Sequence, residues 1–171
     1  MKDMVEILET PVEDLIAFDA QIRLPMVDVE QWDIAERDRL SLVNLGLPLI
    51  DVAEFIPEAE PGTHVRTFGM HTGYYLGILA RLDVCLLPET GHVVGVPNDN
   101  MGSPAFINSS AYQYVAASWR YYWLHSRLRL VPMTLQTYDD LNAFLAGIIA
   151  NDPVVGGDPT TSFWPAVVEG W

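Results

Sequence analysis

The stretch FINSSAYQYVAASWRYYWLH, residues 106–125, decides how this chain folds. Its Asn108-Ser109-Ser110 segment suggests either a nucleophilic serine or the beginning of a helix. A nucleophilic serine usually stands on a tight turn between glycines, and no glycine flanks this pair. Asn and Ser are preferred helix caps, and large apolar side chains follow at helical spacing. We therefore predict a capped helix over about residues 109–126, laid on a sheet through Tyr112, Val115, Trp119 and Trp123.

Aromatic side chains surround this predicted helix instead of forming a single stripe. Such residues could also line a ligand pocket or stack on bases. Tyr112 and Trp119 are expected in the core, whereas Tyr114 and Tyr121 are predicted to be interface aromatics. The basic residues on or just after the helix are expected to pair with the acidic N-terminal third or to form a local anchor point: Arg120, Arg127 and Arg129.

Short strand-like runs precede the helix and predict a mainly antiparallel sheet of about four to six strands. Residues 83–87 and 92–96 flank Pro88-Glu89-Thr90-Gly91. Pro in second place and Gly in fourth are typical of a type I turn, so this segment is a hairpin. The other predicted strands are residues 64–70, 74–79 and an edge strand at 105–107, with His71-Thr72-Gly73 between the first two.

Helices are predicted before and after this sheet region in the sequence. One spans residues 33–45, capped by Asp33 and stopped by Gly46 and Pro48. The other predicted elements are a short helix or arm and a second helix within residues 3–20, an irregular segment at 21–31, and helices at 137–150 and 162–171. No repeat or domain boundary interrupts the pattern, so we predict a single α+β domain over residues 1–171. Residues 1–34 form an N-terminal extension whose structure the sequence does not define.

Charge is the strongest compositional signal, because the net charge is −14. Residues 1–60 hold 15 acidic against 4 basic residues, a balance of −11, and residues 61–171 hold 8 against 5, a balance of −3. Such a surface repels phosphate backbones, so nucleic acid is not expected as a direct ligand. A basic protein partner is one reading of this charge, and solubility alone is the other.

Several kinds of site have no support in the sequence. No phosphate-binding or dinucleotide-binding glycine pattern occurs, and Lys2 is the only lysine. The His and Cys residues match no zinc spacing, so we expect no metal and no cofactor. The lone Cys85 lies in an apolar run and excludes an intramolecular disulfide. Neither a secretory signal nor a membrane span is expected, which fits a cytoplasmic protein.

The order of short motifs along the chain resembles the SUKH superfamily, bacterial immunity proteins related to yeast cell-wall regulators, and specifically its fourth branch. The resemblance covers residues 35–171 and leaves residues 1–34 without a counterpart. The motifs that carry it are Leu45-Gly46-Leu47-Pro48, Thr67-Phe68-Gly69, the hairpin from Glu89 to Val96, Phe106-Ile107-Asn108-Ser109-Ser110, Asp152-Pro153 and Ser162-Phe163-Trp164.

This resemblance implies a non-enzymatic α+β domain that binds and neutralises a toxin delivered between bacteria. Many such toxins are nucleases. We predict that an acidic surface masks a basic toxin, since complementary charge speeds association. The predicted partner-binding residues are Asp51, Glu54, Glu58 and Glu60, with Tyr114 and Tyr121. Two alternatives remain: a scaffold or regulatory subunit that recruits a partner enzyme, and a small-molecule site that uses the aromatics with His71 or His125.

Overall fold

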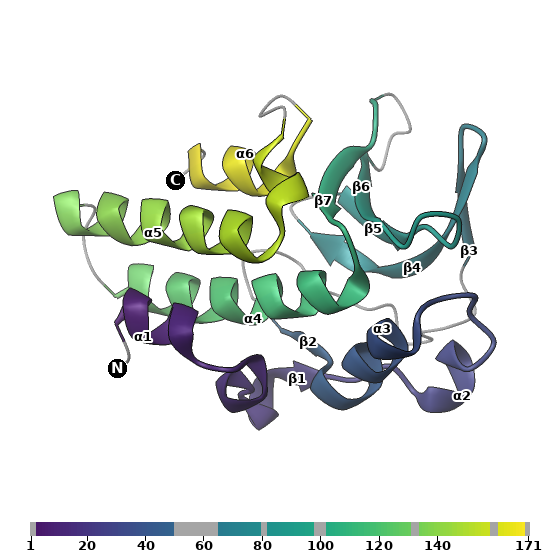
Figure 1. The fold of residues 1–171 in the computed structure, drawn as a ribbon, viewed down its shortest axis with the longest axis horizontal. Helices are drawn as coiled ribbons and strands as arrows, with labels where there is room; N and C mark the ends of the chain where they lie inside the picture. Colours follow the sequence, from purple (N-terminus) through teal and green to yellow (C-terminus); the bar gives the residue numbers. More distant parts are fainter. Residues whose placement is uncertain are drawn as a thin grey trace.

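The structure, a computed structural model, describes residues 3–49, 65–79, 82–97, 102–130, 134–157 and 161–169. Figure 1 shows a curled sheet at one end of the molecule and two long helices, side by side, that extend away from it. Segments from the first third of the chain lie along one side of these helices, and the C-terminal helix lies on the other. The predicted α+β fold class is confirmed.

Within the described residues, the main sheet consists of five antiparallel strands in chain order. They are β3 (Val65–Phe68), β4 (His71–Leu79), β5 (Leu82–Leu86), β6 (Val93–Pro97) and β7 (Ala105–Asn108). The predicted hairpin between β5 and β6 and the predicted edge strand β7 are both confirmed. The backbone N–H of Phe106 donates to the Thr161 carbonyl at 2.8 Å, so the C-terminal segment lies against β7.

The first hairpin turns earlier than predicted. Phe68 pairs with His71, so the turn consists of Gly69 and Met70, and His71-Thr72-Gly73 belong to β4. Gly69 adopts φ +57°, a left-handed conformation that glycine reaches at little cost. The sequence predicts Gly73 as a turn residue, but its position in the strand needs a glycine for space, because a Cβ there would lie 2.9 Å from the Cβ of Cys85.

The helical elements come from both ends of the chain. The α-helices are α1 (Met4–Glu9), α2 (Met26–Val29), α3 (Glu36–Leu40), α4 (Ala111–Leu128), α5 (Leu135–Asn151) and α6 (Phe163–Glu169). The short 3-10 helices are η1 (Val12–Leu15), η2 (Phe18–Ala20) and η4 (Pro153–Gly156), and η3 (Ser41–Leu45) is a π-helix. A two-stranded sheet pairs β1 (Gln21–Ile22) with β2 (Leu47–Pro48). The predicted helix at 33–45 is therefore split, and the residue before α3 is Ala35 rather than the expected cap Asp33.

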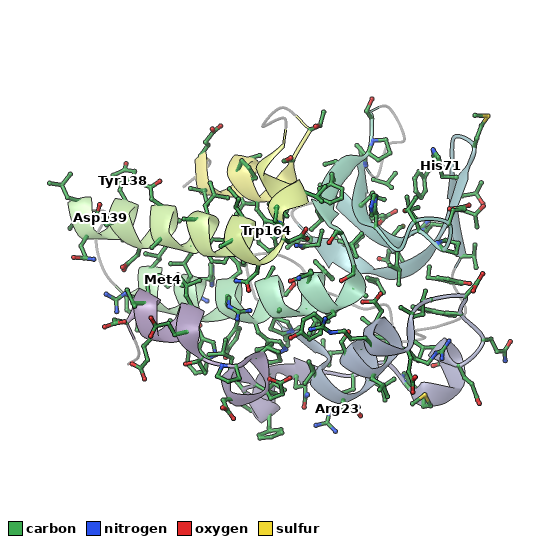
Figure 2. The ribbon with its side chains drawn as sticks, viewed as in Figure 1. Met4, Arg23, His71, Tyr138, Asp139 and Trp164 are labelled. Atoms are coloured by element: carbon green, nitrogen blue, oxygen red, sulfur yellow. The ribbon has the colours of Figure 1, made fainter. Side chains whose placement is uncertain are left out.

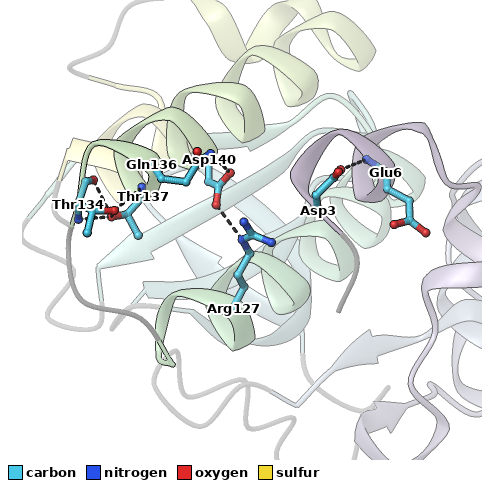
Figure 3. Close-up of polar contacts among 7 residues, drawn as sticks. All are labelled: Asp3, Glu6, Arg127, Thr134, Gln136, Thr137 and Asp140. Carbon is cyan, nitrogen blue, oxygen red and sulfur yellow. Dashed lines mark hydrogen bonds and ion pairs between the residues drawn. The ribbon is translucent and has the colours of Figure 1, made fainter.

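Side-chain caps define where three helices begin. The Ser110 hydroxyl accepts a hydrogen bond from the backbone N–H of Gln113 at 3.2 Å, which confirms the predicted capping of α4. Thr134 and Thr137 cap each other at the start of α5, so that helix begins earlier than the predicted residue 137 (Figure 3). Asp3 accepts from the N–H of Glu6 at the start of α1. Each acceptor satisfies an amide that has no partner within its own helix.

The packing of α4 differs from the prediction. The Trp119 indole N–H donates to the Gly46 carbonyl at 3.1 Å, and the Trp123 indole N–H donates to the Leu15 carbonyl at 2.6 Å. Trp119 and Trp123 on this face thus contact the N-terminal segments. The reason is that the first 49 residues supply their own apolar side chains to the core, where Ile7, Leu15, Leu24, Leu42 and Leu47 are buried.

A second, smaller apolar cluster covers another face of the sheet. It consists of Phe68, Tyr75, Cys85, Leu87, Val94 and Val96. Cys85 is fully buried among them, and burial raises the pKa of its thiol to about 12, with a further contribution from the nearby Asp83 carboxylate.

We therefore expect the Cys85 thiol to be unreactive in the folded protein. Only the thiolate attacks disulfide reagents, and at pH 8 the buried thiol keeps its proton. Titration with 5,5′-dithiobis(2-nitrobenzoic acid) should give negligible reaction under native conditions and one thiol per chain in guanidinium chloride. Rapid reaction of the native protein would show that this cluster is open to solvent.

Candidate functional site

The beginning of α4 is where distant parts of the chain meet. The backbone N–H of Ser109 donates to Asp152 Oδ2 at 2.8 Å, and the N–H of Tyr112 donates to Asp38 Oδ1 at 2.8 Å. Ser110 and Asp38 thus satisfy free amides in the first turn of α4, where the helix dipole favours negative charge, and Asp152 holds the residue just before the cap. The paired serines are therefore structural, as the sequence indicated.

A buried polar network continues from this point toward the C-terminus. The Asn108 side-chain amide donates to Asp152 Oδ2 at 3.0 Å, and the Trp164 indole N–H donates to Asn108 Oδ1 at 3.0 Å. All three side chains are almost completely buried. The motifs Asn108-Ser109-Ser110, Asp152-Pro153 and Ser162-Phe163-Trp164 thus describe one junction that joins β7, α5 and α6.

On the opposite side of α4, a groove opens among segments of the N-terminal third. It has a volume of about 640 Å³, and its lining side chains include Glu13, Glu36, Arg37, Leu40, Leu45 and Tyr112. Glu13 comes from η1, Tyr112 comes from the first turn of α4, and the others come from α3 and η3. Figure 1 shows α3 close to the first turns of α4, which places the groove at this junction.

The charges in the groove are only partly paired. Arg37 lies over the Tyr112 ring, with its guanidinium carbon 3.6 Å from the ring centroid, an arrangement in which a cation is attracted by the aromatic face. The carboxylates of Glu13 and Glu36 are exposed and form no hydrogen bond or ion pair within the described parts of the chain. The groove therefore combines two hydrated carboxylates with an aromatic ring that already accepts a guanidinium.

A second arginine lies behind the groove. Arg120 is buried, its Nη1 donates to the Ala116 carbonyl at 3.1 Å, and its Nε has no hydrogen-bond partner. Burial lowers the pKa of this guanidinium, whereas attraction to Tyr112 and Glu13 raises it. Arg120 therefore adds positive charge close to Glu13 without lining the groove itself.

The residues predicted to bind a partner do not come together in one described site. Asp51, Glu54, Glu58 and Glu60 lie outside the described residues. Tyr114 and Tyr121 are buried, with exposed fractions of 0% and 7%. Tyr121 packs against Phe144 and Trp164, with ring centroids 5.9 and 5.6 Å away. Both tyrosines thus belong to the buried core, and Tyr121 lies where α4 meets α5 and α6.

Arg127 forms an ion pair outside the acidic N-terminal third. Its Nε donates to Asp140 Oδ2 at 2.8 Å, which links the end of α4 to α5 (Figure 3). Gln136 also donates to Asp140, at 3.3 Å. Asp140 belongs to α5, a helix that the sequence predicts with a later start, but the antiparallel contact of α4 and α5 was not predicted.

Sequence reasoning did not identify Glu13, Glu36 and Tyr112 as a group. Tyr112 was assigned to the core by its helical spacing, although it is only half-buried. The available signal was the concentration of acidic residues in the first 60 positions, but charge alone does not indicate which of them share a groove. The alternative of a small-molecule site gains no geometric support. His71 lies on the exposed end of the β3–β4 hairpin (Figure 2), whereas His125 is buried beside Tyr121.

The described residues contain neither a metal-binding cluster nor a membrane-spanning helix. No group of three or more His, Cys, Asp or Glu side chains within those ranges is placed to hold a metal ion. None of the helices in the same ranges has the length and apolar character needed to span a membrane.

The described residues form an α+β fold with a groove between the N-terminal third and the first turn of α4. The chain belongs to the SUKH-4 immunity protein family, whose model matches residues 7–170. The match begins well before residue 35, so the N-terminal third is part of the family domain and not an extension, as its place in the core also indicates. Comparison with curated proteins and with solved structures gives no significant match.

Proposed function

We propose that this chain binds a basic bacterial protein toxin and neutralises it, with the acidic face of its N-terminal third as the docking surface. Membership of an immunity protein family supports a protein toxin as the partner. The observation that carries the choice of surface is the groove lined by Glu13, Glu36 and Tyr112, because it opens within the most acidic part of the chain. The proposed activity is binding alone, without catalysis by this chain.

The surface around the groove has the character of a docking site. Asp14 and Asp19 are exposed near Glu13 in the chain, and Phe18 between them has an exposed fraction of 76%. An exposed aromatic side chain among charged residues is a typical anchor at protein interfaces. Asp51, Glu54, Glu58 and Glu60 are proposed as further contacts of the toxin, since they are four of the 15 acidic residues in the first 60 positions.

Charge reversal tests the acidic face. The product of the adjacent gene serves as the test partner, and a variant carrying Glu54→Lys, Glu58→Lys and Glu60→Lys should associate with it about tenfold more slowly or worse at low salt. The difference should shrink as salt rises, because mobile ions screen exposed charges. Stopped-flow association and rescue of toxin-exposed cells give the two measurements.

A matched variant distinguishes the effect of the acidic face on association from the effect of net charge. Glu89→Lys, Asp139→Lys and Glu169→Lys change the net charge equally at exposed positions outside the N-terminal third. We expect this variant to associate at nearly the original rate and to protect cells fully. Equal loss in both variants would contradict a docking role for the N-terminal third.

A further inference from the structure

We infer that the groove is a slot for an arginine or lysine side chain of the partner, and that Arg37 occupies the aromatic face of this slot in the free protein. The inference deepens the proposed function and rests on it, because it names the chemistry of the partner group that enters the groove. It also assigns a role to Tyr112, which the family match alone does not do.

The walls of the groove suit a long basic side chain. Leu40 and Leu45 offer apolar surface to its aliphatic part, and Glu13 and Glu36 offer carboxylates to its charged end. Long basic side chains bind in this divided way because the methylene groups favour apolar contact while the charge stays near polar atoms. Since neither carboxylate is paired within the described residues, a partner cation would not have to displace an internal ion pair.

Tyr112 already shows that a guanidinium fits against this wall. Arg37 lies 3.6 Å from the ring centroid, close enough for the aromatic face to attract the guanidinium. Arg37 is itself exposed and makes no ion pair within the described chain, so it can leave the ring at little cost. An incoming arginine would therefore exchange with Arg37 on Tyr112 while Arg37 turns into solvent.

Internal positive charge opposes this exchange and makes the inference testable. Arg37 in the groove and Arg120 behind it both repel an incoming cation, whereas Glu13 and Glu36 attract it. Removal of Arg37 should consequently strengthen binding of a basic side chain. If the groove instead bound an acidic or a neutral group, removal of Arg37 would weaken binding or leave it unchanged.

The direct test uses N-acetyl-L-arginine amide as the probe and N-acetyl-L-citrulline amide as its uncharged counterpart. Titration of the ¹⁵N-labelled full chain should shift the backbone amide signals of Tyr112 and Leu45 with the arginine probe and not with citrulline. Tyr112→Leu should weaken binding of the arginine probe roughly two- to fivefold, and Tyr112→Phe, which keeps the ring, should not.

Matched charge variants complete the test. Glu13→Gln and Glu36→Gln should each weaken binding of the arginine probe, whereas Glu30→Gln removes an exposed carboxylate that does not line the groove and should have no effect. Arg37→Ala should strengthen binding, whereas Arg23→Ala, at the exposed position labelled in Figure 2, should not. Equal binding of citrulline, or weaker binding after Arg37→Ala, would overturn the inference.

The same variants distinguish this inference from the proposed function. If the chain neutralises the toxin but Glu13→Gln, Glu36→Gln and Tyr112→Leu leave toxin affinity unchanged, the slot is refuted and the function stands. If the arginine probe binds in the groove with the expected variant pattern while no toxin is bound, the toxin function is refuted and the slot stands.

Discussion

Replacement of Gly46 by alanine is expected to lower the free energy of unfolding by about 3 kcal/mol or more. Gly46 has φ 60° and ψ −170°, a backbone conformation that is essentially restricted to glycine. A Cβ at this position would lie 2.2 Å from the Ile22 carbonyl oxygen, a backbone atom that cannot move without disturbing the β1–β2 pair. The Gly46 carbonyl also accepts the Trp119 indole hydrogen bond, so the strain would reach α4.

Gly69→Ala provides the matched control for this effect. Gly69 has a similar φ of 57°, but no atom lies within 4 Å of the position of its missing Cβ. That variant should lose only about 1 kcal/mol, the cost of a left-handed conformation for alanine. Urea unfolding followed by tryptophan fluorescence measures both variants. Similar losses for the two would mean that the close approach to Ile22 contributes nothing.

Replacement of Trp164 by alanine is expected to have the second large effect, a loss of about 4 kcal/mol. Trp164 has no exposed surface and packs against Phe144 and Tyr121, with ring centroids 5.6 Å from each. Its removal would leave a cavity among these rings and would deprive Asn108 Oδ1 of its indole donor. Both consequences occur inside the junction of β7, α5 and α6.

Trp164→Phe separates the cavity from the lost hydrogen bond. Phenylalanine keeps most of the apolar contact but cannot donate to Asn108, so this variant should lose about 1–3 kcal/mol, the cost of a buried acceptor without a partner. Thermal and urea unfolding measure the two variants. A Trp164→Ala loss below 1 kcal/mol would contradict the tight packing of this junction.

The sequence predicted the elements whose signals are local. The turn at Pro88 and Gly91 determined the second hairpin, and Ser110 determined the beginning of α4, because both depend on neighbouring residues. The first hairpin was misplaced because Gly69 and Gly73 give the same sequence signal, although one supplies a left-handed turn and the other supplies space beside Cys85. Only the paired strands distinguish these two roles.

The packing partners and the groove depend on contacts between distant residues. The helical spacing of Trp119 and Trp123 indicated a buried face, but not whether the sheet or the N-terminal segments would cover it. Tyr114 looked like an interface residue because it lies off that face, and the core extends there as well. The groove was not predicted, since Glu13, Arg37 and Tyr112 become neighbours only when η1 and α3 pack beside α4.

The caps of α4 bear on the order in which the chain folds. Ser110 is present as soon as the helix forms, but the acceptors for Tyr112 and Ser109 come from Asp38 and Asp152, 74 and 43 positions away in the chain. Ordering such long loops costs entropy before any contact compensates for it. A growing polypeptide can therefore begin α4 early, yet the segment that leads into the helix gains its acceptor only after Asp152 has been synthesised and docked. A ribosome-bound chain that ends before residue 152 would still lack this contact at Ser109.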